Sequence, residues 1–293
     1  MKIPLVSISV VTYNHEAFIK TCLDSILSQR TSFDFEILIG EDNSSDDTRE
    51  ICKEYSNKYP EKIKLFLHDR DNVIKINGRP TGRFNFMNNI KNARGKYIAI
   101  CEGDDYWTDP YKLQKQIDYL DANPDVSICF HRVNLLKEGE VELHKLPSQS
   151  LGVKFNYIEL LESYNFIATC SVVFKKPLGF KFPDFFSSIP FGDLALYKIL
   201  SRDKKLYCLN ENMGVYRIHS GGIWSGINEI QSISDYILFY NKIYLNLNKA
   251  EQKIITRKFN LLLKRFSFLK TKNTIHRYLF YLILVIKNLK FYV

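Results

Sequence analysis

Three groups of polar residues follow strand-like segments of the sequence and carry side chains able to do chemistry. They are Thr12 to Glu16, Glu41 to Asp47 and Glu102 to Asp105. In open α/β sheets, ligands bind beyond the carboxyl ends of the strands, so these groups are expected to converge on one edge. Each group by itself is also typical of an ordinary turn or helix cap.

Four carboxylates at such an edge would repel one another unless a cation lay among them. They are Asp42, Glu102, Asp104 and Asp105. Oxygen ligands select Mg²⁺ or Mn²⁺, and these ions commonly bind substrate phosphates as well. The sequence lacks both G-x-x-x-x-G-K-[ST] and a G-x-G-x-x-G after the first strand. We therefore expect a nucleotide diphosphate or triphosphate held through the metal.

Apolar β-branched runs alternate with helical patterns over the first 210 residues, which predicts an α/β fold with a mostly parallel sheet flanked by helices. The expected strands are Val6–Thr12, Phe35–Gly40, Ile63–Leu67, Lys96–Cys101, Val126–Arg132, Thr169–Phe174 and Leu206–Leu209. The expected helices are Ala17–Ser28, Asp46–Tyr59, Phe84–Ala93, Lys112–Asn123 and a region from Asn228 onward. This pattern predicts a catalytic domain over 1–227 and a helical C-terminal region over 228–293.

The net charge of +9 is concentrated near the C-terminus. Residues 242–293 hold twelve Lys and Arg against the single acid Glu251, so residues 1–241 carry a net charge of −2. That near-neutral body disfavours nucleic-acid binding. The basic, aromatic tail is typical of a helix that lies on an anionic membrane surface. It is equally typical of a helical subdomain packed on the main body with solvated lysines.

The cellular compartment is indicated by cysteine usage and by the N-terminus. Six cysteines without a C-x-x-C pair predict buried thiols in a reducing compartment. Met1 to Pro4 lack the features of a secretory signal. The longest apolar run, Tyr278 to Ile286, is about half of what a membrane-spanning helix needs. We expect a cytoplasmic protein without a membrane span, peripheral at the inner face of the cell membrane.

Four segments in order carry a resemblance to a known family. They are SISVVTYNHEAFIKTCLDSILSQ, FEILIGEDNSSDDT, KNARGKYIAICEGDDYWTDPYKLQKQ, and FGDLALYKIL followed by YRIHSGGIWS. Together they resemble the family 2 glycosyltransferases of bacterial surface-polysaccharide type, inverting enzymes with the GT-A fold that use nucleotide-activated sugars. The resemblance covers about residues 5–225.

The resemblance implies roles for the polar groups. Asp42 would bond the uracil imide, and Glu102-Gly103-Asp104 stands where relatives carry D-x-D, with Asp104 as metal ligand. Glu102 replaces the usual Asp and could reach the ribose or the metal. Asp105 either helps to bind metal or caps the next turn. The implied nucleotide-binding residues are Thr12, Tyr13, Asn14, Glu16, Asp42, Arg94, Glu102 and Gly103, with Arg83 a further candidate.

The last two segments supply the remaining implied roles. Asp193 resembles the general base, although glycine precedes it where relatives more often have Glu, and a helix-cap aspartate is the alternative. Tyr216 to Ser225 resembles a flexible lid in which Arg217, His219 and Trp224 face the diphosphate and His219 can join the metal. The pair Tyr106-Trp107 either lines the sugar or acceptor site or packs beneath the loop.

The resulting expectation is a metal-dependent, inverting glycosyltransferase. It would move a hexosyl or N-acetylhexosaminyl group from a UDP-sugar, with Mn²⁺ or Mg²⁺, to a hydroxyl of a glycan or lipid-linked saccharide. A sugar nucleotidyltransferase is the first alternative, but its glycine-rich, lysine-bearing loop is missing after the first strand. The second alternative is a non-catalytic carbohydrate- or membrane-surface-binding relative. Glu102 and Gly192 favour that alternative, whereas Asp42, Asp104 and Asp193 oppose it.

Overall fold

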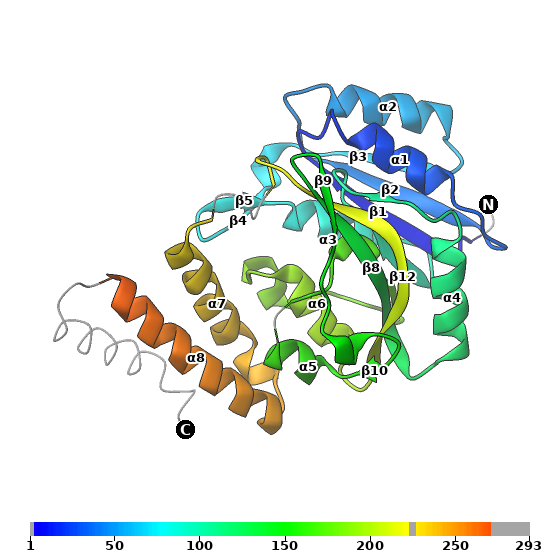
Figure 1. The fold of residues 1–293 in the computed structure, drawn as a ribbon. Coiled ribbons are helices and arrows are strands. Elements are labelled where there is room, and N and C mark those ends of the chain that lie inside the picture. The colour runs from blue at the N-terminus through cyan, green and yellow to red at the C-terminus, as the bar shows by residue number, and fades with distance from the viewer. Residues whose placement is uncertain (1–2, 164, 223–226, 271–293) are drawn as a thin grey trace.

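A ten-stranded sheet forms the centre of the protein, shown as a computed structural model in Figure 1. The structure describes residues 3–163, 165–222 and 227–270. The strand order is β10-β12-β8-β11-β6-β1-β2-β3, with β7 beside β12 and β9 beside β8. The strands are β1 Val6–Thr12, β2 Phe35–Glu41, β3 Ile63–Leu67, β6 Tyr97–Ile100, β7 Tyr106–Trp107, β8 Val126–Lys137, β9 Glu140–Leu143, β10 Lys154–Phe155, β11 Val173–Lys175 and β12 Lys205–Ile218. A separate hairpin joins β4 Ile74–Ile76 to β5 Arg79–Thr81.

The sheet combines parallel and antiparallel pairings. Strand β1 pairs in parallel with β2 and β6, and β2 pairs in parallel with β3. Strand β11 runs antiparallel between β6 and β8, while β8 and β12 are parallel. The predicted α/β class is confirmed, and the parallel strands β6, β1 and β2 bring the three polar loops to one edge.

Helices cover both faces of the sheet because the strands alternate their side chains between two cores. They are α1 Ile19–Leu27, α2 Thr48–Lys58, α3 Arg83–Asn92, α4 Lys112–Ala122, α5 Tyr157–Glu162, α6 Gly192–Leu200, α7 Glu229–Ile243 and α8 Lys249–Lys270. Helices α1, α2 and α4 pack in one core with Val6, Ile8 and Val10 of β1. Helices α3, α5, α6, α7 and α8 pack in the other core, which includes Ile98 and Ile100 of β6.

Three predicted strands differ from the observed ones by more than one residue. Strand β8 continues to Lys137 rather than ending at Arg132, because residues beyond Arg132 pair with β12 and β9. Thr169–Ser171 forms a 3-10 turn, so β11 begins only at Val173. Strand β12 continues to Ile218 rather than ending at Leu209, because residues beyond Leu209 pair with β8 and β7. The register between β12 and β8 shifts on both sides of Asn212, and such irregularities break the two-residue alternation that marks a strand in sequence.

Buried asparagines of α3 fix this helix against the sheet. The Asn89 amide nitrogen donates to the Val10 and Leu38 carbonyl oxygens at 3.1 and 3.0 Å. The Asn85 amide nitrogen donates to the Gly40 carbonyl oxygen at 2.6 Å. A Cβ at position 40 would lie 1.4 Å from Asn85 Oδ1, so this contact needs glycine.

The described part of the C-terminal region packs on the body of the protein. Figure 1 shows α7 and α8 side by side, and Phe239, Ile255 and Phe259 belong to the same core as the sheet residue Phe130. The α8 residues Lys264 and Arg265 are exposed beside the exposed Leu261. The apolar run Tyr278 to Ile286 lies outside the described residues. Within the described residues, no helix has the length and apolarity needed to cross a membrane.

Candidate active site

The loops after β1 and β2 are joined by hydrogen bonds that use side chains of both. The Asn14 amide oxygen accepts from the Ser45 N–H at 2.9 Å. Asp46 accepts from the Glu16 N–H at 3.1 Å, and Glu16 accepts from the Asp47 N–H at 3.0 Å. The structure thus gives Asn14 and Glu16 a bracing contact that holds the two loops at one edge.

The loop after β6 reaches the same edge because Gly103 has no side chain. Its N–H donates to the Val11 carbonyl oxygen at 3.0 Å. A Cβ at position 103 would lie 2.6 Å from Thr12 Oγ1 and 3.0 Å from His15 Nδ1. Thr12 is itself buried under this loop. Gly103 therefore permits the close approach that places Asp104 beside the β1 loop.

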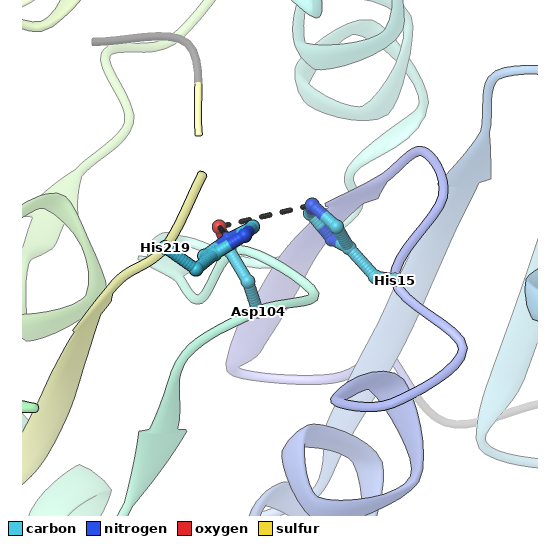
Figure 2. A group of neighbouring side chains, drawn as sticks. All are labelled: His15, Asp104 and His219. Atoms are coloured by element: carbon cyan, nitrogen blue, oxygen red, sulfur yellow. Dashed lines mark hydrogen bonds and ion pairs between the residues drawn. The ribbon is translucent and has the colours of Figure 1, made fainter. Parts of the chain in front are cut away.

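Two histidines lie on either side of the Asp104 carboxylate (Figure 2). Asp104 Oδ2 is 3.1 Å from His219 Nε2 and 3.7 Å from His15 Nε2. The possible ligand atoms of His15, Asp104 and His219 all lie within 4.8 Å of one another. Asp104 and His219 were predicted for this site, whereas His15 was not. The only signal for His15 in the sequence is its place between Asn14 and Glu16.

Charge and burial favour the metal-binding protonation states of His15 and Asp104. Burial lowers the pKa of His15, which favours the neutral imidazole that a metal needs. Burial alone would raise the pKa of Asp104, but the hydrogen bond from His219 and the electrostatic interaction with His15 hold it below its ordinary value. Two imidazoles and a carboxylate suit a transition ion such as Mn²⁺ better than Mg²⁺, which prefers oxygen ligands alone. The cluster therefore fits a divalent transition metal.

Asp105 has a different role from Asp104. It is buried and accepts the Arg217 N–H at 2.8 Å, which ties the acidic loop to β12. The Arg217 guanidinium donates to the Asp104 carbonyl oxygen at 2.5 Å and lies 4.5 Å from the centre of the Tyr106 ring. Trp107 is buried, and the Lys112 ammonium lies 3.8 Å from the centre of its ring. Asp105 and Trp107 thus support the loop from below, whereas Tyr106 and Arg217 border it.

A third group lies beside the β2 loop. The Arg70 guanidinium stacks 3.9 Å from the centre of the Tyr13 ring, and its Nη1 lies 3.3 Å from the Asp42 carboxylate. Burial raises the pKa of Asp42, and Arg70 partly opposes that shift. Tyr13 and Asp42 were predicted nucleotide contacts, while Arg70 was missed because it lies in a short 3-10 helix without a recognisable motif.

Asp193 lies in the first turn of α6 without serving as its N-cap, which is Phe191. Its carboxylate accepts a hydrogen bond from the Asn165 amide nitrogen. Burial raises the pKa of Asp193. A Cβ at position 192 would lie 2.3 Å from a guanidinium nitrogen of Arg83, which packs over Phe186. The glycine before Asp193 therefore leaves room for Arg83, a packing reason for the missing Glu.

Glu102 interacts electrostatically with both Asp104 and Asp193. Its Oε2 is buried and has no hydrogen-bond partner among the described residues. Burial and the charges of Asp104 and Asp193 raise the pKa of Glu102 to about 7. A buried carboxyl oxygen without a partner is costly, which favours a ligand that would complete its hydrogen bonding.

The predicted residue Arg94 is not part of this arrangement. Arg94 is exposed and pairs with Glu36 near the start of β2, at the opposite edge of the sheet from Asp104. The reason is the position of Arg94 before β6, where the amino ends of the parallel strands meet. Trp224 lies outside the described residues. The first three residues of the expected lid, Tyr216 to Ile218, belong to β12 instead.

Comparison with known proteins bears on these observations. The family described as "Glycosyl transferase family 2" matches residues 7–179, more than half of the chain. The chain belongs to glycosyltransferase family 2. An uncharacterized protein of Mycobacterium tuberculosis is 36% identical over 218 residues, which cover 74% of this chain and 60% of that protein. The chain thus spans less than two thirds of the length of this relative.

Two solved structures share the fold. S. aureus TarS 1-349 in complex with UDP superposes with a TM-score of 0.59 at 17% identity, covering 91% of this chain and 73% of that one. The mannosyltransferase PcManGT from Pyrobaculum calidifontis, in complex with GDP-Man and Mn²⁺, gives a TM-score of 0.58 at 16% identity. It covers 92% of this chain and 72% of that one. These likenesses confirm the GT-A glycosyltransferase fold.

Proposed function

We propose that this chain is a metal-dependent, inverting glycosyltransferase that uses a UDP-sugar and transfers the sugar to an acceptor hydroxyl. The observation that carries the proposal is the His15–Asp104–His219 cluster at the carboxyl edge of a GT-A sheet. Membership of glycosyltransferase family 2 supports it. So do the fold neighbours, which bind UDP, UDP-GlcNAc or GDP-Man.

The donor nucleotide would lie between the β1 and β2 loops. Tyr13 and Arg70 offer a stacking surface, and Asp42 offers a carboxylate to the imide N–H of uracil. Asp42 is buried, so water competes less for its carboxylate, and a hydrogen bond from a base edge would be stronger there. This arrangement supports UDP as the donor nucleotide.

The diphosphate would lie beside Asp104, His15 and His219. A divalent cation held there would stabilise the negative charge that develops on the departing diphosphate. His15 and His219 would hold it as neutral imidazoles, and Arg217 would border the diphosphate from β12. Mn²⁺ is the ion we propose, because nitrogen ligands disfavour Mg²⁺ and the fold neighbour PcManGT is in complex with Mn²⁺.

Asp193 would act as the general base for the acceptor. The acceptor hydroxyl attacks the anomeric carbon as the bond to the diphosphate oxygen breaks, and its proton passes to the Asp193 carboxylate. Attack from the face opposite the leaving group inverts the anomeric configuration. Asn165 would orient the carboxylate by donating to one of its oxygens.

Thermal unfolding with nucleotides tests the donor site without knowledge of the acceptor. A ligand that binds only the native state raises the melting temperature by mass action. We expect UDP with Mn²⁺ to raise it more than UDP alone, and more than GDP, CMP or dTDP with Mn²⁺. If no nucleotide shifts the melting temperature, the non-catalytic alternative replaces this proposal.

The pH dependence of transfer tests the contact between Asn165 and Asp193. This hydrogen bond favours the ionised carboxylate, so Asn165→Ala is expected to raise the pKa of Asp193 further. A base works when deprotonated, so the acidic limb of the pH–rate profile should move to higher pH. The control Asn210→Ala changes an exposed amide and should leave that limb in place. An unmoved limb in Asn165→Ala would show that Asp193 is not the group that titrates.

We propose that residues 1–227 form the catalytic unit and that the basic C-terminal region places it at an anionic membrane surface. The exposed Leu261 and Phe268 lie on α8 with the exposed Lys264 and Arg265. We expect the full chain to co-float with vesicles containing phosphatidylglycerol at low salt and to dissociate at high salt. Equal recovery with neutral vesicles would refute the membrane proposal without affecting the catalytic one.

A further inference from the structure

An apolar pocket of about 270 Å³ lies among the helices next to Asp193. Helices α5, α6, α7 and α8 all contribute to its walls. Most of its lining is aliphatic or aromatic, including Leu160, Leu161, Leu194, Phe239 and Leu262. Leu261, which also lines it, is 61% exposed, so the pocket borders the surface at α8.

The pocket is continuous with the surroundings of the proposed general base. Asn165 lines the pocket and donates a hydrogen bond to the Asp193 carboxylate. Leu194 lines it from the position next to Asp193. Tyr236 also lines it, and burial together with the nearby Asp193 charge raises the pKa of Tyr236. Asp193 does not itself line the pocket, but its hydrogen bond with Asn165 links its carboxylate to the pocket wall.

The composition of the walls restricts what the pocket can bind. A bare sugar presents many hydroxyl groups that need hydrogen-bonding partners, and the leucine and phenylalanine side chains supply none. The polar groups of the lining belong to Ser163, Asn165, Tyr236, Tyr240 and Lys258. An alkyl chain needs none and gains free energy by leaving water. The chemistry of the pocket thus favours the apolar part of a ligand.

One wall and the adjoining surface of α8 are positively charged. Lys258 lines the pocket, and its ammonium donates to the Ser163 carbonyl oxygen at 2.6 Å. An ammonium has three N–H donors, so this bond uses one of them. Arg257 and Lys264 are exposed on the same helix, whereas Arg265 there is paired with Glu229. This charge complements an anionic group, such as a phosphate, at the end of the chain.

We propose that this pocket binds the alkyl or isoprenoid chain of an amphipathic, phosphate-linked acceptor whose hydroxyl is presented to Asp193. The inference rests on the proposed function for its link to catalysis and defines the acceptor as lipid-linked rather than a free glycan. The chain lies against Leu161, Phe239 and Leu262, and the phosphate lies near Lys258.

Calorimetric titration with hexyl, octyl and decyl phosphate, each below its micellar concentration, tests the pocket. Each buried methylene contributes about 0.8 kcal/mol, so affinity should rise about fourfold per methylene until the pocket is filled. Leu262→Trp, which fills the pocket, should weaken octyl phosphate binding at least about tenfold. Leu261→Glu, at the exposed rim, should do the same by repelling the phosphate. The matched control Leu245→Trp lies at a 77% exposed position outside the pocket and should change binding less than about twofold.

The melting-temperature shift with UDP and Mn²⁺ is measured in all four proteins to separate the two proposals. The inference is supported if both pocket variants lose octyl phosphate binding but keep the wild-type melting-temperature shift with UDP and Mn²⁺. The inference is overturned if the affinity for alkyl phosphates does not depend on chain length, or if both pocket variants bind octyl phosphate as the wild type does. Neither result affects the melting-temperature shift with UDP and Mn²⁺, so the proposed function would stand. A Leu262→Trp protein that changes oligomeric state without ligand would assign the pocket to a second copy and also overturn it. Octyl phosphate binding without any UDP shift would leave the pocket as an apolar site and refute UDP as the nucleotide of the proposed donor.

Discussion

Asp193→Asn is expected to lower the rate of sugar transfer by about 10²- to 10⁴-fold, the usual contribution of a general base. The amide has nearly the shape of the carboxylate but cannot accept the acceptor proton. It also places an N–H where Asn165 now donates to a carboxylate oxygen. Initial rates with a UDP-sugar and an alkyl-phosphate-linked acceptor give the comparison.

The control for this variant is Asp184→Asn, which changes an exposed carboxylate in the segment before α6. It should retain the wild-type rate. The melting-temperature shift with UDP and Mn²⁺ should persist in both variants, because Asp193 is not part of the His15–Asp104–His219 cluster. If Asp193→Asn transferred sugar at the wild-type rate, another residue would have to be the general base.

Asp104→Asn is expected to abolish the extra stabilisation that Mn²⁺ gives with UDP and to reduce transfer at least about a hundredfold. Asp104 is the carboxylate between the two histidines, so its replacement removes the charged ligand of the proposed metal. A bound metal contributes several kcal/mol to the stabilisation of the leaving group, and about 2.7 kcal/mol corresponds to a hundredfold change in rate.

Manganese binding can be followed directly by electron paramagnetic resonance in the same samples. Asp118→Asn, an exposed carboxylate on α4, serves as the matched control and should bind Mn²⁺ with UDP as the wild type does. If Asp104→Asn keeps full Mn²⁺ binding and full activity, the cluster is not a metal site. Loss of folding is detected separately, because melting without ligand is recorded for every variant.

Much of the fold could be predicted because it depends on local pattern. The apolar runs of β1 and β2 are buried strands in the structure, and the apolar face of α1 is buried as its spacing predicts. Strand β12 was predicted too short, because its outer half owes its conformation to pairing with β8 and β7. Pairing between segments far apart in the chain leaves little trace in a local pattern.

The candidate site was predictable where residues follow strands and unpredictable where they do not. Asp42 and Asp104 follow β2 and β6, so their shared edge could be expected. Arg70 lies in a short 3-10 helix and Asn165 in an irregular segment. Only the tertiary structure brings Arg70 to Asp42 and Asn165 to Asp193. Arg94 shows the converse error, because a basic residue near a motif lies at the opposite edge of the sheet.

Hydrophobic periodicity and the direction of parallel strands were enough to predict the α/β class, the order of the main elements and the convergence of acidic loops on one edge. The tertiary structure was needed to show that His15 joins Asp104 and His219, and that an apolar pocket lies near Asp193. These contacts join distant parts of the chain, because most of the protein separates His15 from His219 and four helices form the pocket. Contacts of that kind depend on how side chains pack in three dimensions, which no local pattern encodes.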